Sequence, residues 1–234
     1  MAFSHGKGTV VLVGTSDLSC YLNSVDWSKS ADTHETTTFC QDAKTYIPGL
    51  KDGTATLAGL YDGDLDAVDQ VLDGILGGTA QVVTVGVEGM ATGKRCRLLK
   101  ALESEYSVSS PVGDVVAVDA SIQADGGILA GVSLQALTAA TGTGNGTSVD
   151  HGAATSNGGV AHLHVTAFTG ANGVIKVQHS ADGSTWVDLV TFATVNGKTV
   201  ERQEVSGTVN RYLRAIRSTG TFTNITHAIA FARR

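Results

Sequence analysis

Glycine-containing turn pairs punctuate this 234-residue chain and limit the length of its regular elements. Asn172-Gly173, Asp182-Gly183 and Asn196-Gly197 recur in the last third, and Pro48-Gly49 and Asp52-Gly53 mark turns near the start. Such pairs tolerate the positive φ of a tight hairpin, and the segments between them are short and rich in β-branched residues. The pattern predicts antiparallel β structure, with a small sandwich or jelly roll of about six strands at the C-terminal end.

One segment departs from the strand pattern. Its apolar residues stand at helical spacing, at Leu65, Val68, Leu72 and Leu76. We predict an N-cap at Asp64 and a stop at Gly77-Gly78. The expected fold class is therefore all-β, with one short helix packed on a sandwich or half-barrel.

Charge divides the chain unevenly. Residues 1–140 hold 8 Lys and Arg against 17 Asp and Glu, whereas residues 141–234 hold 8 against 5. Between these parts, Thr141–Ser148 has no apolar side chain and is typical of a flexible linker. We predict a domain at 1–137, a Gly/Thr-rich linker at 138–148 and an antiparallel β-sandwich module at 149–234. The acidic first part argues against ordinary nucleic-acid binding, because that needs Lys and Arg to neutralise phosphates.

Membrane and redox signals are weak. No run approaches the ~20 apolar residues of a membrane span, and Val10–Val13 is too short for a secretory signal. Cys20, Cys40 and Cys96 lack Cys-x-x-Cys spacing, so we expect free thiols made in a reducing compartment and no structural zinc.

Motifs for catalysis or cofactor binding also fail on spacing. Gly89–Lys94 has three residues between its glycines, where a phosphate loop needs four. His162 and His164 alternate on one strand face, which we expect to point to water, and nothing in the spacing brings a third ligand near. Ser, His and Asp residues are too scattered for a triad. We expect no enzyme activity, no catalytic, cofactor-binding or metal-binding residues, and no cofactor.

Two stretches carry a resemblance to a known family. Tyr21–Phe39, continuing into Ala43–Asp62, resembles the N-terminal part of major tail tube proteins from siphophages that infect actinobacteria. The similarity extends over most of the first 137 residues. Val177–Trp186 and Val205–Arg214 are similar to an appended β module in the same kind of protein.

This resemblance implies a structural virion protein that gives strands to a shared ring barrel. Six copies would form a ring, and stacked rings would form a hollow tube for DNA ejection into the host. The implied location is the virion tail, assembled in the bacterial host cytoplasm without membrane insertion. The implied partners are other copies, a tape measure protein, and tail terminator and distal tail proteins. DNA would pass through without specific binding.

The resemblance also implies roles for particular residues. In that family a long loop after an early strand grips the next ring, and the polar stretch Ser28–Thr38, expected as an irregular excursion, stands at its place. The inter-ring candidates are Ser28, Lys29, Asp32, His34, Glu35 and Thr38. An acidic channel wall would repel DNA phosphates. Its candidates are Glu103 and Glu105, which alternation places on one face, and Asp119; the alternative is an ordinary solvated face.

A carbohydrate- or surface-binding β-sandwich protein is the alternative function. Trp186 lies beside a hairpin signal and would stack on sugar rings in that case. Packing of Trp186 in the sandwich core is the competing interpretation.

Overall fold

The structure, a computed structural model, describes residues 5–234, which divide into two compact units. Unit 1 comprises Met1–Cys20, Val82–Leu98 and Leu129–Arg234, and unit 2 comprises Tyr21–Gln81 and Leu99–Ile128. Strands dominate both units, and the described residues contain one α-helix, α1 (Val68–Ile75), besides a single 3-10 turn at Gly6–Gly8. The predicted all-β fold with one short helix is confirmed.

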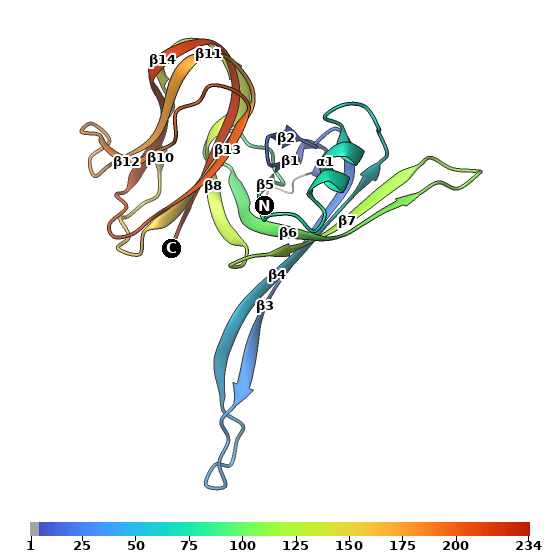
Figure 1. Cartoon of the computed structure of the whole chain (residues 1–234). Coiled ribbons are helices and arrows are strands. Elements are labelled where there is room, and N and C mark those ends of the chain that lie inside the picture. The colour runs from blue at the N-terminus through green and yellow to red at the C-terminus, as the bar shows by residue number, and fades with distance from the viewer. Residues whose placement is uncertain (1–4) are drawn as a thin grey trace. The chain divides into compact units, whose positions relative to one another are not determined.

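Unit 2 is built on an antiparallel sheet in the order β3-β4-β7-β6 (Figure 1). Its strands are β3 (Leu22–Glu35), β4 (Tyr46–Leu60), β7 (Ala117–Ala124) and the part of β6 (Arg95–Ser109) that follows Leu98. Leu57 on β4 pairs with Val25 on β3 and with Ala120 on β7, which fixes the register of three strands at one row. Directly paired residues share a face, so the register also fixes which side chains are covered.

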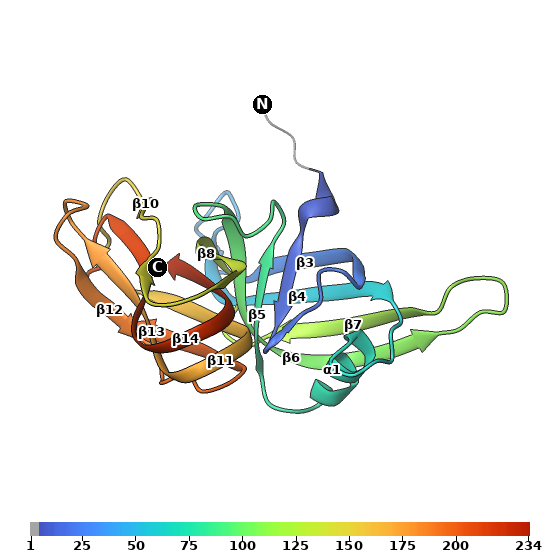
Figure 2. The ribbon, with the colours of Figure 1, turned by 90° about the horizontal axis from the view of Figure 1, so that it is seen from above.

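One face of this sheet is apolar and lies under helix α1 (Figure 2). Ala55 and Leu57 on β4 and Ile122 on β7 are at most 4% exposed. The helix buries Val68 and Leu72, and its Asp69 accepts a hydrogen bond of 2.6 Å from the hydroxyl of Tyr106 on β6. Burial of one sheet face under one amphipathic helix is what the alternating pattern of β4 requires.

The helix begins later than the sequence predicts. Ala67 is its N-cap and makes no side-chain cap bond, so the predicted N-cap at Asp64 is wrong. Local hydrogen bonds explain the difference: Asp62 Oδ1 accepts the Asp64 N–H at 2.9 Å, and Asp66 adopts a φ of 64°. This tight loop leaves Leu65 82% exposed rather than in the apolar stripe of the helix.

Unit 1 is organised by two strands of 22 residues, β11 (Gly159–Ser180) and β14 (Tyr212–Arg233), which pair antiparallel along their length. Register shifts between Val165 and Ile175 bend the pair, so that its two halves pack on each other around one apolar cluster (Figure 1). Asn172-Gly173 therefore marks a bend within β11, with Asn172 at a φ of 52°, and not the predicted hairpin.

Shorter strands flank this pair. β12 (Val187–Thr191) and β13 (Thr199–Val205) both pair with β11. The predicted hairpin at Asp182-Gly183 is confirmed, because these residues join β11 to β12. The hairpin predicted at Asn196-Gly197 is wrong. Strands β12 and β13, on either side of this pair, both have β11 as their partner, at different positions along it.

The other flank of β14 carries β8 (Leu129–Ala140), β9 (Gly144–Asn145) and β10 (Val149–Asp150). The predicted linker at 138–148 thus contains the end of β8 and all of β9. As a boundary between separately folding parts, it stays a prediction.

The remaining strands of unit 1 cover one face of β11 and β14. They are β1 (Val10–Val13), β2 (Ser16–Asp17), β5 (Gln81–Gly86) and the first residues of β6. Leu12 and Leu98 form an apolar cluster with Ala228 and Ala230 of β14. In register, Ala228 pairs with His164 and Ala230 with His162, so both histidines lie on this covered face.

The prediction that His162 and His164 face water is therefore wrong, since both are fully buried. His164 Nδ1 donates to the Gly14 carbonyl at 2.8 Å, and its Nε2 accepts from the Thr84 hydroxyl at 2.8 Å. Thr84 Oγ1 then accepts from His162 Nδ1 at 3.0 Å. Burial lowers the pKa of His164 to about 4, so both rings are neutral members of a buried polar chain.

Candidate functional site

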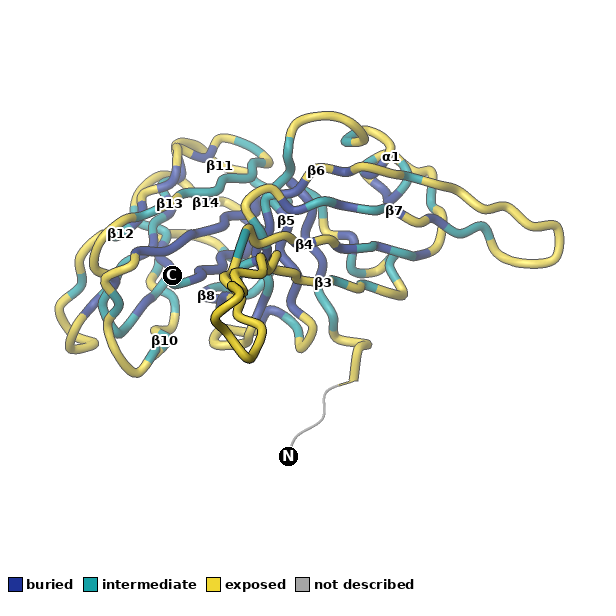
Figure 3. The backbone as a smooth tube through the Cα atoms, turned by 90° about the horizontal axis from the view of Figure 1, so that it is seen from below, coloured by how far each residue is buried: buried dark blue, intermediate teal, exposed yellow. Residues whose placement is uncertain are grey.

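The first candidate element is an arm formed by β3 and β4 beyond the sheet of unit 2. Every residue from 28 to 48 is exposed, and Figure 3 shows this segment in the colour of exposed residues. The two strands pair from Ala31 with Lys51 to Glu35 with Tyr46, and residues 36–45 close the tip. Ser28–Glu35 therefore belongs to strand β3 and is not the predicted irregular excursion. Hydrogen bonds between the two strands pair the backbone N–H and C=O groups of this segment, although it buries no apolar side chain. The polar composition of the segment therefore did not predict a strand.

The predicted inter-ring residues all lie on this arm, and several stabilise it. Ser28 Oγ lies 2.8 Å from Thr54 Oγ1 across the strand pair. Glu35 forms an ion pair of 3.0 Å with Lys44 near the tip, and the Thr38 backbone N–H donates to Gln41. Asp32 and His34 lie against Gly49, where an added Cβ would come within 2.8 Å of the His34 ring; Lys29 is also on β3.

The apolar side chains of the arm were not predicted from the sequence. They are large and exposed: Phe39, Tyr46, Ile47 and Leu50. Phe39 lies at the tip and Leu50 is 81% exposed on β4. Four large apolar side chains on an otherwise polar ribbon are the kind of exposed patch that marks a protein contact. The sequence signal that could have indicated this patch is Phe39, an aromatic residue within a polar run.

The second candidate element is the sheet face of unit 2 opposite helix α1. One row of paired residues crosses all four strands as Asp26, Thr56, Ser121 and Glu105. The next row runs through Ser24, Ala58, Asp119 and Ser107, and a third through Ser28, Thr54, Gln123 and Leu102. We call these three rows the acidic face. They contain three carboxylates and no basic side chain.

A basic residue occurs only where this face ends. Lys100 lies beyond the third row and forms an ion pair of 2.5 Å with Asp125. Unit 2 as a whole holds 4 Lys and Arg against 15 Asp and Glu, a net charge of −11. The potential over the acidic face is therefore negative and is not cancelled by neighbouring cations.

The three predicted channel residues do not lie together. Glu105 and Asp119 are exposed on the acidic face, whereas Glu103 is 4% exposed on the face under α1. A bulge between Glu103 and Glu105 inserts one residue, so Glu103 pairs with Ile122 but Glu105 pairs with Ser121. A one-residue slip reverses the face of each following side chain, and the expected shared face of these two glutamates is thereby lost.

Burial changes the chemistry of Glu103. Neither of its carboxylate oxygens has a hydrogen-bond partner among the described residues. Burial, together with the nearby Asp73 carboxylate, raises the pKa of Glu103 to about 8. The burial of Glu103 within the subunit argues against a role for this residue in a channel wall.

Trp186 is half-buried and lies outside the apolar cluster of unit 1, so it is not a core residue. The Arg214 guanidinium covers its ring at 4.1 Å from the centroid. A cation over the ring face occupies the surface that a sugar would need.

Within residues 5–234, no three His, Cys, Asp or Glu side chains gather to hold a metal ion. No helix in the same range is long and apolar enough to cross a membrane.

No protein-family model and no curated protein sequence matches this chain. Among solved structures, it is similar to a chain in the virion of a native gene transfer agent, with 14% identity and a TM-score of 0.44 over 54% of this chain and 97% of that chain. It is similar to the SPP1 tail tube (11% identity, TM-score 0.44, 55% and 78% covered). A third similar structure is a chain in the sheath–tube complex of an extracellular contractile injection system, with 16% identity and a TM-score of 0.43 over 56% of this chain and 92% of that chain. At TM-scores below 0.5, these similarities establish no shared function.

Proposed function

We propose that this chain is the major tail tube subunit of a long, non-contractile phage tail. Six copies form a ring, and rings stack into a tube that carries DNA out of the virion. The acidic face of unit 2 is the observation that carries this proposal. The sequence resemblance of residues 21–62 to tail tube proteins suggests which assembly such a face would serve. A tape measure protein and proteins at the two tube ends are the expected partners.

The acidic face has the chemistry that a DNA channel needs. DNA carries about one negative charge per 1.7 Å of helix axis, and each Lys or Arg on a wall would bind phosphate and slow transit. Asp26, Glu105 and Asp119 repel phosphate instead, and the serine and threonine hydroxyls between them keep the surface wetted. We assign Glu105 and Asp119 to the channel wall and add Asp26.

The arm supplies the contact between rings. A two-stranded ribbon is only marginally stable alone in water, so an exposed ribbon with apolar residues such as Phe39 and Leu50 gains order by docking on another chain. Because the arm is polar apart from these residues, it stays soluble before assembly. We therefore assign Ser28–Thr38 and the facing part of β4 to ring stacking.

Shortening the arm tests the stacking role. Replacing residues 31–51 by Asn-Gly joins the paired residues Ser30 and Asp52 through a tight hairpin turn. The variant should remain folded by circular dichroism and form no tubes in electron micrographs. Phe39→Ser should weaken stacking in the same direction. Normal tubes from the shortened chain would refute the stacking role.

Charge reversal tests the channel role separately. Particles assembled with Glu105→Lys and Asp119→Lys should form normally and eject DNA more slowly, with the defect eased by salt. Asp114→Lys, in the turn between β6 and β7 and outside the acidic face, is the matched control. Unchanged ejection from particles that contain the double variant would refute the channel role and leave the stacking role standing.

A further inference from the structure

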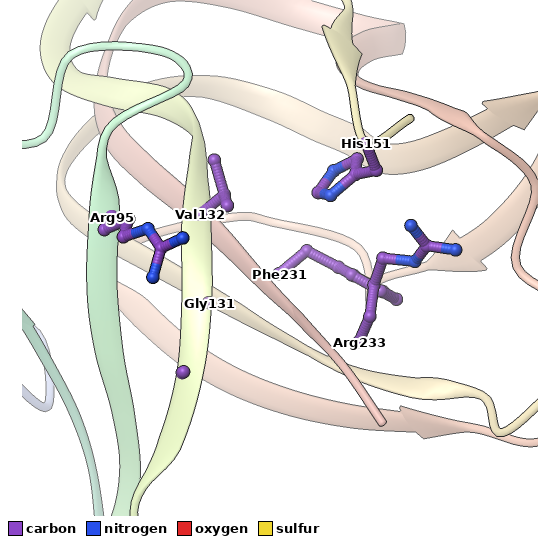
Figure 4. A pocket seen from close by; sticks show the side chains of 7 residues that line it. Arg95, Gly131, Val132, His151, Phe231 and Arg233 are labelled. Carbon is purple, nitrogen blue, oxygen red and sulfur yellow. The ribbon is translucent and has the colours of Figure 1, made fainter. Parts of the chain in front are cut away.

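Unit 1 contains a cavity of about 210 Å³ with a basic lining. Arg95 on β6, Val132 on β8 and Phe231 on β14 are paired in one row, and Arg233 lies two residues beyond Phe231 on the same face. The lining also includes Ala130 and Gly131, whose small size leaves the hollow between the two arginines, and His151 after β10. Figure 4 shows Arg95 on one side and His151 with Arg233 on the other, with Val132 and Phe231 between them.

The polar groups of this cavity lack an anionic partner. Within residues 5–234, Nε2 of His151 and Nε of Arg233 are buried without a hydrogen bond, and Arg233 Nη2 makes only a long contact of 3.4 Å to the Val209 carbonyl. No carboxylate lines the cavity. Asp150, next to His151 in sequence, is held by two hydrogen bonds of 2.6 Å to Arg211.

The pKa shifts of the lining residues are consistent with the absence of a carboxylate from the cavity. Burial lowers the pKa of His151, and the neighbouring Arg233 lowers it further. Burial also lowers the pKa of Arg233. Two cations and a neutral imidazole thus surround a hollow in which the buried Arg233 Nε–H donor is unpaired. Guanidinium forks bind carboxylate and phosphate groups through paired hydrogen bonds, and of these two a carboxylate is the group that protein side chains supply.

Charge separation between the units identifies the source of that carboxylate. Unit 1 holds 12 Lys and Arg against 7 Asp and Glu, a net charge of +5, whereas unit 2 carries −11. Copies of such a chain attract one another head to tail, with unit 1 of one copy facing unit 2 of the next. A second copy of this chain is therefore the occupant that charge complementarity favours.

Within unit 2, Asp62–Asp66 supplies a free carboxylate beside an exposed leucine. Asp64 is exposed and its carboxylate has no partner among the described residues, and the adjacent Leu65 is 82% exposed. A carboxylate beside an exposed leucine complements a cavity in which arginines flank the half-buried Val132. We propose that the Arg95–Arg233 cavity of one copy binds the Asp64 carboxylate of a second copy, with Leu65 of that copy packed against Val132. This inference rests on the proposed self-assembly.

A charge swap in the full-length chain tests the contact. Arg95→Glu alone and Asp64→Arg alone should each lower ring or tube formation, measured by sedimentation velocity and micrographs, by at least about tenfold. The double variant restores opposite charges and should recover most of the assembly. Arg97→Glu, on the same strand face but outside the cavity lining, and Asp114→Lys are the charge-matched controls.

A disulfide trap provides an independent readout that tolerates partial defects in assembly. Ala130→Cys with Leu65→Cys, in a chain whose Cys20 and Cys40 are replaced by serine, should give cross-linked oligomers on oxidation. Absence of both charge-swap rescue and cross-linking in a chain that still assembles would overturn this contact and leave the proposed function intact. Phosphate-induced shifts of the His151 resonances without rescue would assign the cavity to a free oxyanion and also overturn it. A parent chain that never assembles would refute the proposed function together with this contact.

Discussion

Replacing Glu103 by glutamine should stabilise unit 2 at neutral and alkaline pH. The Glu103 carboxyl is 4% exposed, its oxygens have no partner among the described residues, and its pKa is raised from 4.5 to about 8 by burial and by Asp73. Between these two pKa values the folded state holds a proton that the unfolded chain has released. The free energy of unfolding therefore falls as pH rises, by about 1.4 kcal/mol per pH unit.

The interval from pH 4.5 to 8 spans 3.5 pH units. The accumulated loss at pH 8 is on the order of 4 kcal/mol, a large part of the ~5–15 kcal/mol that stabilises a typical domain. Glu103→Gln has nearly the same shape as the protonated acid and cannot ionise. It should therefore match the parent chain at pH 5 and exceed its stability increasingly up to pH 8.

Tryptophan fluorescence can follow unit 2 alone. The chain has two tryptophans, and in a Trp186→Phe background the remaining Trp27 reports on strand β3. Urea unfolding at pH 5, 6, 7 and 8 would then compare Glu103→Gln with its parent. Glu105→Gln, an exposed glutamate on the same strand, should stay within about 0.5 kcal/mol of the parent at each pH. Parallel pH curves for the parent chain and Glu103→Gln would refute this reasoning.

Three further outcomes follow from the packing. Gly59→Ala should destabilise unit 2 by about 1–3 kcal/mol in urea unfolding, because its Cβ would lie 2.3 Å from the Tyr21 carbonyl oxygen. Gly74→Ala is the control: its Cβ would lie in open space on α1, and it should stabilise unit 2 by up to about 1 kcal/mol. Tyr106→Phe should cost about 1–2 kcal/mol, since it removes the 2.6 Å hydrogen bond to α1. The pKa of His164 is lowered from 6.5 to about 4, so this ring alone should remove up to about 1.4 kcal/mol of the stability of unit 1 per pH unit as pH falls from 6.5 to 4. Burial also lowers the pKa of His162 and His227, which adds to the loss, and a stability of unit 1 that does not fall with acidification would contradict the burial of these rings in the neutral form.

Local signals carried the parts of the fold that the sequence predicted well. Asp182-Gly183 formed its hairpin because the turn and the strands on either side lie within about ten residues. The helix formed because Val68 and Leu72 share one face, although its first turn was lost to the hydrogen bonds around Asp62. In both cases, the deciding interactions are close in sequence.

Long-range packing decided what the sequence could not predict. The strand containing His162 alternates in the way a half-exposed strand does, yet Thr84, 78 residues away in sequence, covers it. Asn172-Gly173 has the composition of a hairpin turn, but β14 pairs with β11 on both sides of it and holds the chain extended. A turn pair permits a hairpin and does not require one when a partner strand is present on both sides.

The candidate site was predictable in composition but not in register. Three of the 17 acidic residues of the first part of the chain lie on one face, and Glu105 and Asp119, which the sequence nominated, are two of them. Glu103 does not, because a bulge has no sequence signature in a run such as Glu103-Ser104-Glu105. Asp26 belongs to the same face through pairing across four strands, a relation visible only once the register is known.

The arm and part of the acidic face belong to the same two strands, β3 and β4, and this links the proposed channel role to the proposed stacking role. β3 and β4 run from the row of Asp26 and Thr56 into the arm with regular pairing up to Ala31 and Lys51. The base of the arm is fastened to β7, where the Gln123 amide donates to the Gly53 carbonyl at 3.1 Å. A register shift follows between Ala31 and Thr33, and a bulge increases local twist. The arm thus has a base continuous with the acidic face and a bend beyond it, so the proposed docking of the arm on another copy would also fix the orientation of the carboxylates on the acidic face.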